Sequence, residues 1–375
     1  MFPAILPHKH KCRIFSPLFA LFLIVMGVPA LHAAITSKGM EFWLAFPQGY
    51  GNASTPATLQ LFITSSNNTS GQVQIPGNGF TVPFTVAAGA STQIILPDVE
   101  ATLSDGTAPL GIHVTATSQI SVYGLNYVQY ASDGYLGLPV EALGTSYMVC
   151  AYKNEANGSS PLIATEFAVV GTQDCTNVTI TPRLTVGSHL GGVPYAVTLN
   201  QGDVYQLQDS TVPDDLTGSL ISSDKPVALF GGHVCDFVPA GVPSCNHLVE
   251  ELWPLQYWGT QFITMPLATR TGGDTIRFIS SSNATTVTVN GTALAPLQKG
   301  WSVDENEQVP LYVTSNNPIY VVQFSDGGTQ DYSGSNYPAD PTMISIPPVN
   351  EFDTSYTIGI PVTAFSGNYE NILTS

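Results

Sequence analysis

The sequence predicts an all-β protein built from tandem antiparallel modules that are similar to β-sandwiches. Hydrophobic residues make up 43% of the 375 residues and charged residues only 10%, with 16 Tyr, 17 Phe and many polar turn residues. That mixture is typical of short strands joined by turns. Within the apolar segments, hydroxylated residues alternate with apolar ones, as in residues 178–181, which puts one face on a core. A similar phrase also recurs about every hundred residues.

Residues 1–34 are expected to form a secretory signal peptide. An apolar run at 17–29 lies between three basic residues and two small residues that offer a cleavage site: Lys9, Lys11, Arg13, Ala33 and Ala34. The run is short for a membrane span, so removal is favoured over an uncleaved anchor. No later segment is long and apolar enough to span a bilayer. The mature chain is therefore predicted to be secreted or displayed at the cell surface.

The charge of the chain argues against one class of partner. Loss of residues 1–34 would remove three basic residues and no acidic one, changing the formal net charge from −17 to −20. A negative field of this kind repels phosphate backbones, so nucleic acid is not expected to bind.

Three modules are predicted at 35–143, 144–256 and 257–350, and 351–375 is expected to begin a fourth, truncated module. Each begins with an aromatic strand, whose anchors are Phe42, Tyr147, Phe262 and Tyr356. A strand–turn–strand pair, a Gly-centred turn and a closing pair of strands follow, the closing pairs lying at 111–127, 218–235 and 310–327. Roughly seven or eight short strands per module suit a sandwich. The alternative is an arrangement like a β-propeller, with two blades per module.

The predicted mature chain has four cysteines: Cys150, Cys175, Cys235 and Cys245. An even number in an exported protein favours disulfides. Of the three possible pairings, we prefer Cys235–Cys245, which closes one loop, together with Cys150–Cys175. This pairing would stabilise the second module alone.

Metal binding is the alternative to disulfide formation, and no cofactor is expected. His233-x-Cys235 and Cys245-x-His247 have the ligand types of a zinc site, but their spacing differs from common zinc patterns. Asp326, Asp331 and Asp340 lie in a polar loop and could offer oxygen ligands to calcium, without the register of a known calcium loop. A polar surface loop is the simpler interpretation.

The stretch 231–258 is expected to be an exposed loop and the contact region, because it differs most between the module copies and loops commonly carry recognition. The candidate binding residues are His233, Asp236, His247, Trp253, Tyr257 and Trp258. The three aromatic residues could anchor a partner, but packing at a junction between modules is the favoured explanation.

No catalytic motif is present, so the chain is not expected to be an enzyme. A secreted hydrolase acting on polysaccharide or protein is the rival hypothesis, and it would need two convergent carboxylates or a metal. The sequence offers only scattered acids: Asp236, Glu250, Glu251 and Asp274. A structural matrix component is the third possibility.

Four phrases in this order resemble the N-terminal domain family of the IgG-Fc-binding protein, which has exported bacterial relatives: GMEFWLAFP, DGYLGLPVEALGTSY, SDKPVALFGGHVC and CNHLVEELWPLQYWGTQF. The resemblance covers nearly all of residues 38–375. Cys235, His247 and Glu250 match positions of the family pattern, whereas Asn246 stands where Asp is expected.

The resemblance implies an extracellular, non-enzymatic β protein with several modules, and it carries no residue motif for Fc binding onto this chain. We therefore expect an exported, adhesin-like protein that binds a glycoprotein or a glycan. Alanine at Trp253 and Trp258 is expected to weaken that binding without unfolding the chain.

Overall fold

The computed structural model describes residues 36–51, 54–129, 131–155, 164–331 and 340–353, with Ser355, Tyr356, Ile358 and Ile372. Their regular structure consists of strands and four short 3-10 helices, with no α-helix in these ranges, which confirms the all-β antiparallel prediction. No helix in the same ranges is long and apolar enough to cross a membrane. The predicted signal peptide and most of the predicted fourth module lie outside the described residues.

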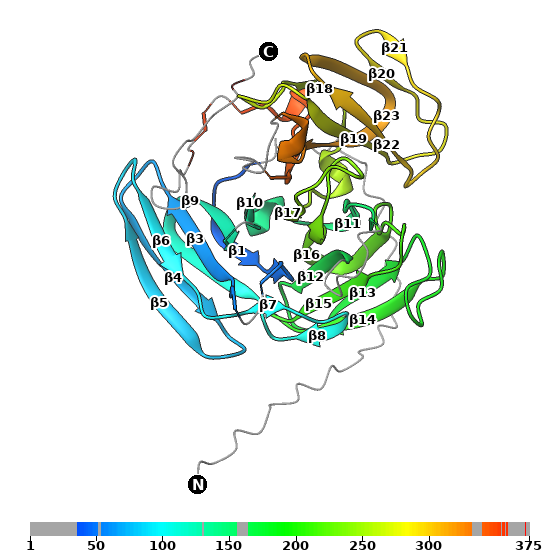
Figure 1. Ribbon diagram of the computed structural model, residues 1–375. Helices are drawn as coiled ribbons and strands as arrows, with labels where there is room; N and C mark the ends of the chain where they lie inside the picture. Colours follow the sequence, from blue (N-terminus) through cyan, green and yellow to red (C-terminus); the bar gives the residue numbers. More distant parts are fainter. Residues whose placement is uncertain are drawn as a thin grey trace, which may run out of the picture. The chain divides into compact units, whose positions relative to one another are not determined.

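Three antiparallel sheets carry the fold, and each is built around one long strand (Figure 1). The first sheet contains β1 (Gly39–Leu44), β3 (Thr58–Thr64), β4 (Thr69–Ile75), β5 (Phe80–Val86), β6 (Ser91–Ile95), β9 (Ile112–Tyr127) and β10 (Asp133–Leu136). A short parallel pair joins β2 (Phe46–Pro47) to β7 (Glu100–Ala101).

The second and third sheets repeat this order. The second contains β8 (Asp105–Ala108), β11 (Gly144–Met148), β12 (Thr165–Gly171), β13 (Thr176–Thr181), β14 (Tyr195–Leu199), β15 (Val204–Asp209), β16 (Leu220–Asp236) and β17 (Asn246–Glu251). The third contains β18 (Gly259–Thr264), β19 (Asp274–Ser280), β20 (Val287–Val289), β21 (Thr292–Ala293), β22 (Ser302–Glu307), β23 (Leu311–Ser325) and β24 (Thr342–Ile346). The 3-10 helices are η1 (Val140–Ala142), η2 (Leu255–Tyr257), η3 (Gly328–Gln330) and η4 (Val349–Glu351).

The long strands correct one expectation. The sequence predicts a closing pair of strands with a turn at Lys225-Pro226, but β16 runs without interruption through both residues. Its first part pairs with β11 and β13, and its second part pairs with β12 and β17. The prediction was wrong because Pro226 lies where the strand changes partners, and the chain stays extended there.

A hydroxyl group marks this changeover in all three sheets. In each case the side chain just after the strand β3, β12 or β19 donates a hydrogen bond to a carbonyl of the long strand: Ser65 to Gln119 (2.8 Å), Thr172 to Pro226 (2.6 Å) and Ser281 to Pro318 (2.5 Å). These bonds connect the ends of β3, β12 and β19 to the long strand at the point where its partners change.

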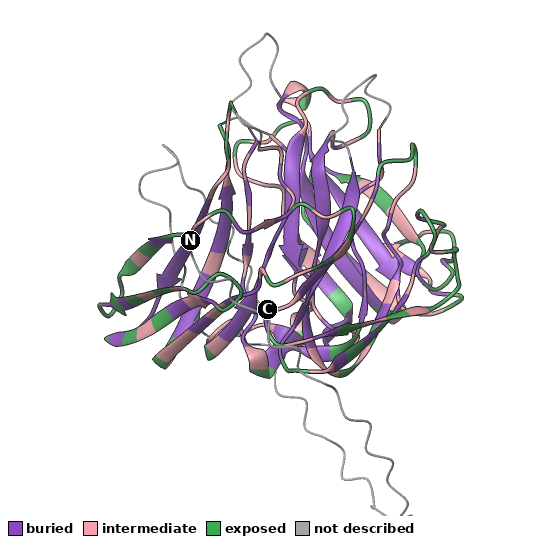
Figure 2. Cartoon of the chain, turned by 90° about the horizontal axis from the view of Figure 1, so that it is seen from below, coloured by how far each residue is buried: buried purple, intermediate pink, exposed green. Residues whose placement is uncertain are grey.

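The strands bury a continuous apolar interior. In Figure 2 the inner strands are buried along most of their length, and exposed residues gather in turns and outer strands. The core of the first sheet also includes Phe230 and Val249 of the second sheet, and the core of the second includes Tyr320 and Phe324 of the third. Successive sheets therefore share cores, a source of stability through burial of apolar surface.

Two further features join successive sheets. The segment β8 leaves the first repeat and pairs with β15 as an edge strand of the second sheet. At the next junction the buried guanidinium of Arg277 donates to Asp215 (2.9 Å), Thr217 (3.1 Å) and the carbonyl of Ala151 (2.6 Å), besides pairing with Asp304 of its own sheet. Polar contacts thus join the first repeat to the second and the second repeat to the third.

Candidate functional site

The hairpin formed by β16 and β17 occupies the stretch that the sequence singles out. Cys235, at the end of β16, and Cys245, just before β17, form a disulfide, which confirms that pairing. The pairing Cys150–Cys175 is wrong, because Cys150 is a free thiol in the core of the second sheet. Burial raises the pKa of that thiol above its ordinary value, so it is a poor nucleophile.

His233 and Asp236 lie in β16 and are buried. His233 Nδ1 accepts a hydrogen bond from the Cys235 amide (3.2 Å), and Nε2 lies 2.9 Å from Asn154 Oδ1. The proton therefore sits on Nε2 of a neutral ring. Burial lowers the pKa of His233 to about 3 and raises that of Asp236 to about 8. Their 3.3 Å contact is consequently one between neutral groups at pH 7.

His247 in β17 is buried as well. Its Nδ1 lies 3.0 Å from the carbonyl oxygen of His233, so that nitrogen carries the proton and donates it. Burial lowers the pKa of His247 to about 4. Both histidines thus act as neutral hydrogen-bonding groups inside the hairpin.

The aromatic residues after β17 pack between sheets. Trp258 and Tyr257 are buried and Trp253 is half-buried. The Trp258 ring stacks on Tyr320 of the third sheet with ring centroids 5.2 Å apart, and its Nε1 donates to the Trp253 carbonyl (3.2 Å). The expectation that 231–258 is an exposed loop is wrong, because two paired strands and this aromatic packing bury most of it. Ligand binding by these residues stays a prediction.

The structure gives the predicted metal ligands other partners. No group of three or more His, Cys, Asp or Glu side chains within the described ranges is arranged to hold a metal ion. Asp331 accepts hydrogen bonds from the amides of Thr271 and Gly272 and pairs with Arg270. Asp326 accepts one from Thr275 (2.7 Å).

Buried carboxyl groups gather where β10, β17 and β24 contact one another. Each accepts a hydrogen bond from the main chain of another repeat: Asp133 from Val249 (3.0 Å) and Met343 (3.2 Å), Glu250 from Ser345 (3.1 Å), and Glu251 from Leu138 (2.8 Å). We call Asp133, Glu250 and Glu251 the carboxyl cluster. It joins all three sheets.

Burial dominates the protonation of the carboxyl cluster. It raises the pKa of Glu250 to about 8 and raises the pKa values of Asp133 and Glu251 well above their ordinary range. Burial thus favours the protonated form of all three groups, which is how a buried carboxyl group without a cation avoids the cost of a buried charge. Through their hydrogen bonds, the three groups connect different repeats.

The acids that a hydrolase would need are therefore interior groups. Asp236, Glu250, Glu251 and Asp274 are all buried, and Asp274 accepts hydrogen bonds from the Leu267 amide (2.7 Å) and Gln323 (3.0 Å). Asp133 is not among the residues predicted from the sequence. Its one signal is that it begins DGYLGLPVEALGTSY, one of the phrases that carry the family resemblance.

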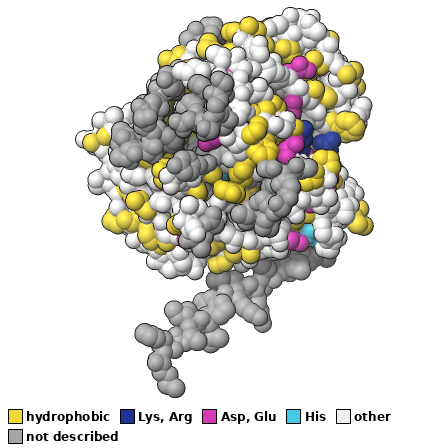
Figure 3. All heavy atoms as spheres, viewed as in Figure 1, with side chains coloured by type: hydrophobic (Ala, Val, Ile, Leu, Met, Phe, Trp, Pro, Cys, Tyr) yellow, Lys and Arg dark blue, Asp and Glu magenta, His cyan; other side chains and the backbone are white. Residues whose placement is uncertain are grey.

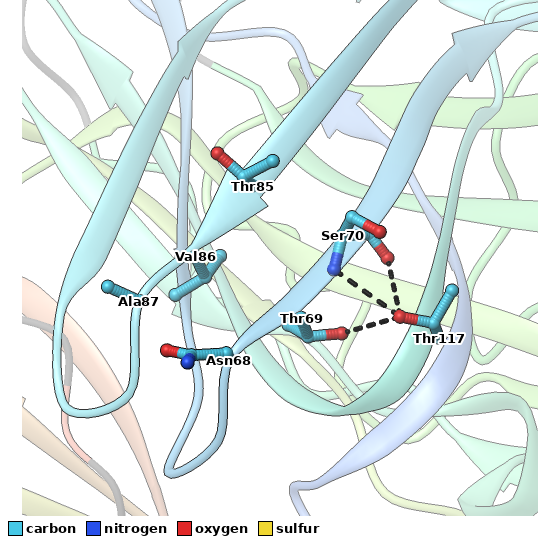
Figure 4. A pocket seen from close by; sticks show the side chains of 7 residues that line it. All are labelled: Asn68, Thr69, Ser70, Thr85, Val86, Ala87 and Thr117. Carbon is cyan, nitrogen blue, oxygen red and sulfur yellow. Dashed lines mark hydrogen bonds between the residues drawn. The ribbon is translucent and has the colours of Figure 1, made fainter.

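A shallow groove of about 460 Å³ opens on the first sheet instead (Figure 4). It is lined by Asn68, Thr69, Ser70, Thr85, Val86, Ala87 and Thr117. Thr117 Oγ1 donates to the Ser70 carbonyl (3.2 Å) and lies 3.1 Å from Thr69 Oγ1, and Asn68 Oδ1 accepts from the Ala88 amide (2.8 Å). The groove thus offers neutral hydroxyl groups on β4, β5 and β9 and the amide group of Asn68 in the turn before β4. Sequence reasoning missed it, because a hydroxyl-rich turn gives no specific signal.

Known proteins provide one consistent comparison. A model of the family described as IgGFc binding protein matches residues 133–375. The IgGFc-binding protein of Homo sapiens is 30% identical over 329 residues, which are 85% of this chain and 6% of the human protein. The chain thus spans a small part of the length of that relative. No solved structure matches it significantly.

Proposed function

The chain belongs to the IgGFc-binding protein family, and from this premise we propose that it is an exported, non-enzymatic, adhesin-like protein that binds a glycoprotein or a glycan. It acts outside the cell, in secreted or surface-displayed form. The human relative is named for binding the Fc part of IgG, so Fc is one glycoprotein ligand to test.

The groove on the first sheet is the observation that supports this proposal. Its lining is uncharged and rich in hydroxyl groups, and the face seen in Figure 3 carries few charged side chains among uncharged and apolar ones. Hydroxyl and amide groups on fixed strands suit ligands that are themselves rich in neutral hydroxyl groups, as saccharides are. The buried acids favour binding over hydrolysis, because a general acid must reach its substrate.

A binding screen tests the proposal. The purified chain is applied to an array of glycans, glycoproteins and IgG Fc with and without its glycan. Thr85→Arg places a long side chain in the groove, and we expect it to weaken binding roughly tenfold or more, the effect of losing ~1.4 kcal/mol. Thr81→Arg, an exposed position on the same strand β5 outside the groove, is the matched control and should bind as the parent does.

Two results would contradict the proposal. One is the absence of any retained ligand. The other is equal binding by the Thr85→Arg and Thr81→Arg variants, which would move the site away from the groove. Turnover of an array glycan that disappears with Glu250→Gln would favour the hydrolase instead.

A further inference from the structure

The three sheets contain the same turn before the equivalent strands β6, β15 and β22. Gly89, Gly202 and Gly300 occupy it with φ of 73°, 82° and 77°, a region that favours glycine. In each sheet the amide of this glycine donates to a carbonyl at the end of the neighbouring strand, namely Ser65, Gly171 and Ser280, at 2.8 Å. The three turns are structurally equivalent positions.

Two of these turns are covered by the preceding repeat. The Gly111 amide donates to the Gly202 carbonyl (2.9 Å), and a Cβ on Gly218 would lie only 2.1 Å from the Gly300 carbonyl oxygen. Gly202 and Gly300 are buried in consequence, whereas Gly89 is exposed. Within the described ranges, no repeat covers the Gly89 turn of the first sheet. This turn therefore lacks the contact with a preceding repeat that the turns at Gly202 and Gly300 make.

The strand after the turn differs between the first and second sheets, whereas the third sheet ends at β22 without an outer strand among the described residues. In the second sheet β8 pairs with β15, and the buried Gln206 donates to the Leu103 carbonyl (2.9 Å) of the first repeat. The equivalent strand β6 ends the first sheet, with no outer partner among the described residues. Its Ile95 is 62% exposed. An open edge of this kind favours addition of another strand.

The third sheet has the surface that would contact a following repeat. The aromatic anchors align the three long strands, because Phe42 pairs with Val114, Tyr147 with Ile221 and Phe262 with Val313. In this alignment Pro310 is equivalent to Gly111 and Gly218. The neighbouring Val309 is 57% exposed and Tyr312 is 50% exposed.

The strands β10, β17 and β24 show the same difference between covered and uncovered repeats. By the same pairing, Ile344 of β24 is equivalent to Tyr135 and Glu250. Tyr135 is buried against Phe230 of the next sheet, with ring centroids 4.9 Å apart, and Glu250 is buried against the Ser345 amide of the next sheet. Ile344, which has no next sheet in the described ranges, is 38% exposed.

The start of a fourth repeat lies beside the first. The Asp353 amide donates to the Tyr356 hydroxyl (2.7 Å), as the Gly144 amide donates to the Tyr147 hydroxyl (2.8 Å) at the start of the second repeat. Lys38 Nζ donates to the Ser355 carbonyl (2.6 Å), which holds this start next to β1.

We propose that the two uncovered faces form a seat for one further β module of this repeat, joined to the chain after Tyr356. The module seat comprises the Gly89 turn and β6 on the first sheet and the Val309, Tyr312 and Ile344 surface on the third. The incoming module adds a strand to β6, as β8 does to β15. It covers Ile344 as the second and third sheets cover Tyr135 and Glu250.

An extended chain tests this. Residues 43–143 of the protein itself are joined after Tyr356, so that Tyr356 takes the place of Phe42. Hydrogen exchange is then measured in the peptides 91–95 and 309–312 of the original and extended chains. We expect exchange to slow by roughly tenfold or more in both peptides and to stay unchanged in β14, an outer strand of the second sheet.

Substitutions in the seat provide the matched control. Ile95→Lys and Ile344→Lys should lower the melting temperature of the extended chain and leave that of the original chain unchanged. Val193→Lys, 51% exposed on the second repeat, should affect neither. The proposal is wrong if the added residues resist protease while both peptides exchange as before. It is equally wrong if the added residues remain protease-sensitive.

Discussion

At the scale of residues, the protein uses carboxyl groups as neutral hydrogen-bonding units. Asp133, Glu250 and Glu251 accept hydrogen bonds from main-chain amides of neighbouring repeats, and burial raises their pKa values, which favours the protonated form. Acidic residues in this sequence therefore divide into two chemical classes. Acids at the surface, and those such as Asp331 that pair with an arginine, carry negative charge, whereas the carboxyl cluster accepts hydrogen bonds as neutral groups do.

Glu250→Gln tests this role. Because burial raises the pKa of Glu250 from its ordinary 4.5 to about 8, the unfolded chain releases this proton above about pH 4.5 while the folded chain keeps it. The stability from Glu250 is thus full below pH 4.5 and is lost as pH rises to about 8. Glutamine keeps the acceptor for Ser345 without a titrating proton.

We expect the parent to lose about 2 to 4 kcal/mol more than the Glu250→Gln variant between pH 5 and pH 8.5, at ~1.4 kcal/mol per pKa unit. Urea unfolding at both pH values measures the difference. Parallel pH profiles of the two proteins would show that Glu250 is ionised in the folded state.

At the scale of elements, the long strands β9, β16 and β23 organise each sheet because they change partners midway. The sequence predicted their positions, since the recurring phrases at 111–127, 218–235 and 310–327 fall on them. It could not predict their continuity. Lys225-Pro226 has the local chemistry of a turn, and only the strands that pair on either side, far away in sequence, keep it extended.

Thr172→Val tests the hydroxyl group at the changeover. The substitution removes the donor to the Pro226 carbonyl and should lower the free energy of unfolding by about 1 kcal/mol. Thr179→Val, an exposed threonine of β13, is the control and should change stability little. Equal effects from both would mean that the changeover does not depend on this bond.

The contribution of the disulfide at the end of the β16–β17 hairpin to stability can be measured by removing both cysteines. Closure of a ten-residue loop, the separation of Cys235 and Cys245, is worth about 2.5 to 3 kcal/mol in the chain-entropy model. The Cys235→Ala/Cys245→Ala variant should be destabilised by that order in chemical unfolding. Native Cys150 should resist alkylation in both proteins, because it is buried; rapid labelling would contradict its position in the core.

At the scale of the whole molecule, the modular periodicity could be predicted and the junctions could not. Phe42, Tyr147 and Phe262 recur at spacings that locate the first strand of each sheet. The contacts of Arg277 with the second repeat, the exchange of β8 and the burial of His233 depend on which repeats meet, and no local pattern encodes that. Cys150 illustrates the limit: an even number of cysteines suggested a bond that this residue, a free thiol in the core, does not form.

The sum of the buried groups predicts an acid-tolerant fold. Burial raises the pKa of Asp236 and Glu250 to about 8, of Glu307 to about 7 and of Asp326 to about 6. All lose stability as pH rises from about 4 towards these values. The two buried histidines act oppositely, losing stability as pH falls from 6.5 towards 4, but they are fewer.

We therefore expect a higher melting temperature at pH 5 than at pH 8. Calorimetry across this range, at constant ionic strength, measures it. A maximum at or above pH 8 would contradict the protonation of the interior.

The pairing of β8 with the second sheet has a practical consequence for the design of fragments of this chain. A fragment cut at the apparent boundary before Gly144 would leave the β15 edge without the partner that Asp105–Ala108 supplies, and would expose Gln206 to solvent. Such a bare edge invites aggregation during expression. A soluble fragment of the second repeat should instead include residues 103–108, fused through a short linker so that β8 can pair with β15.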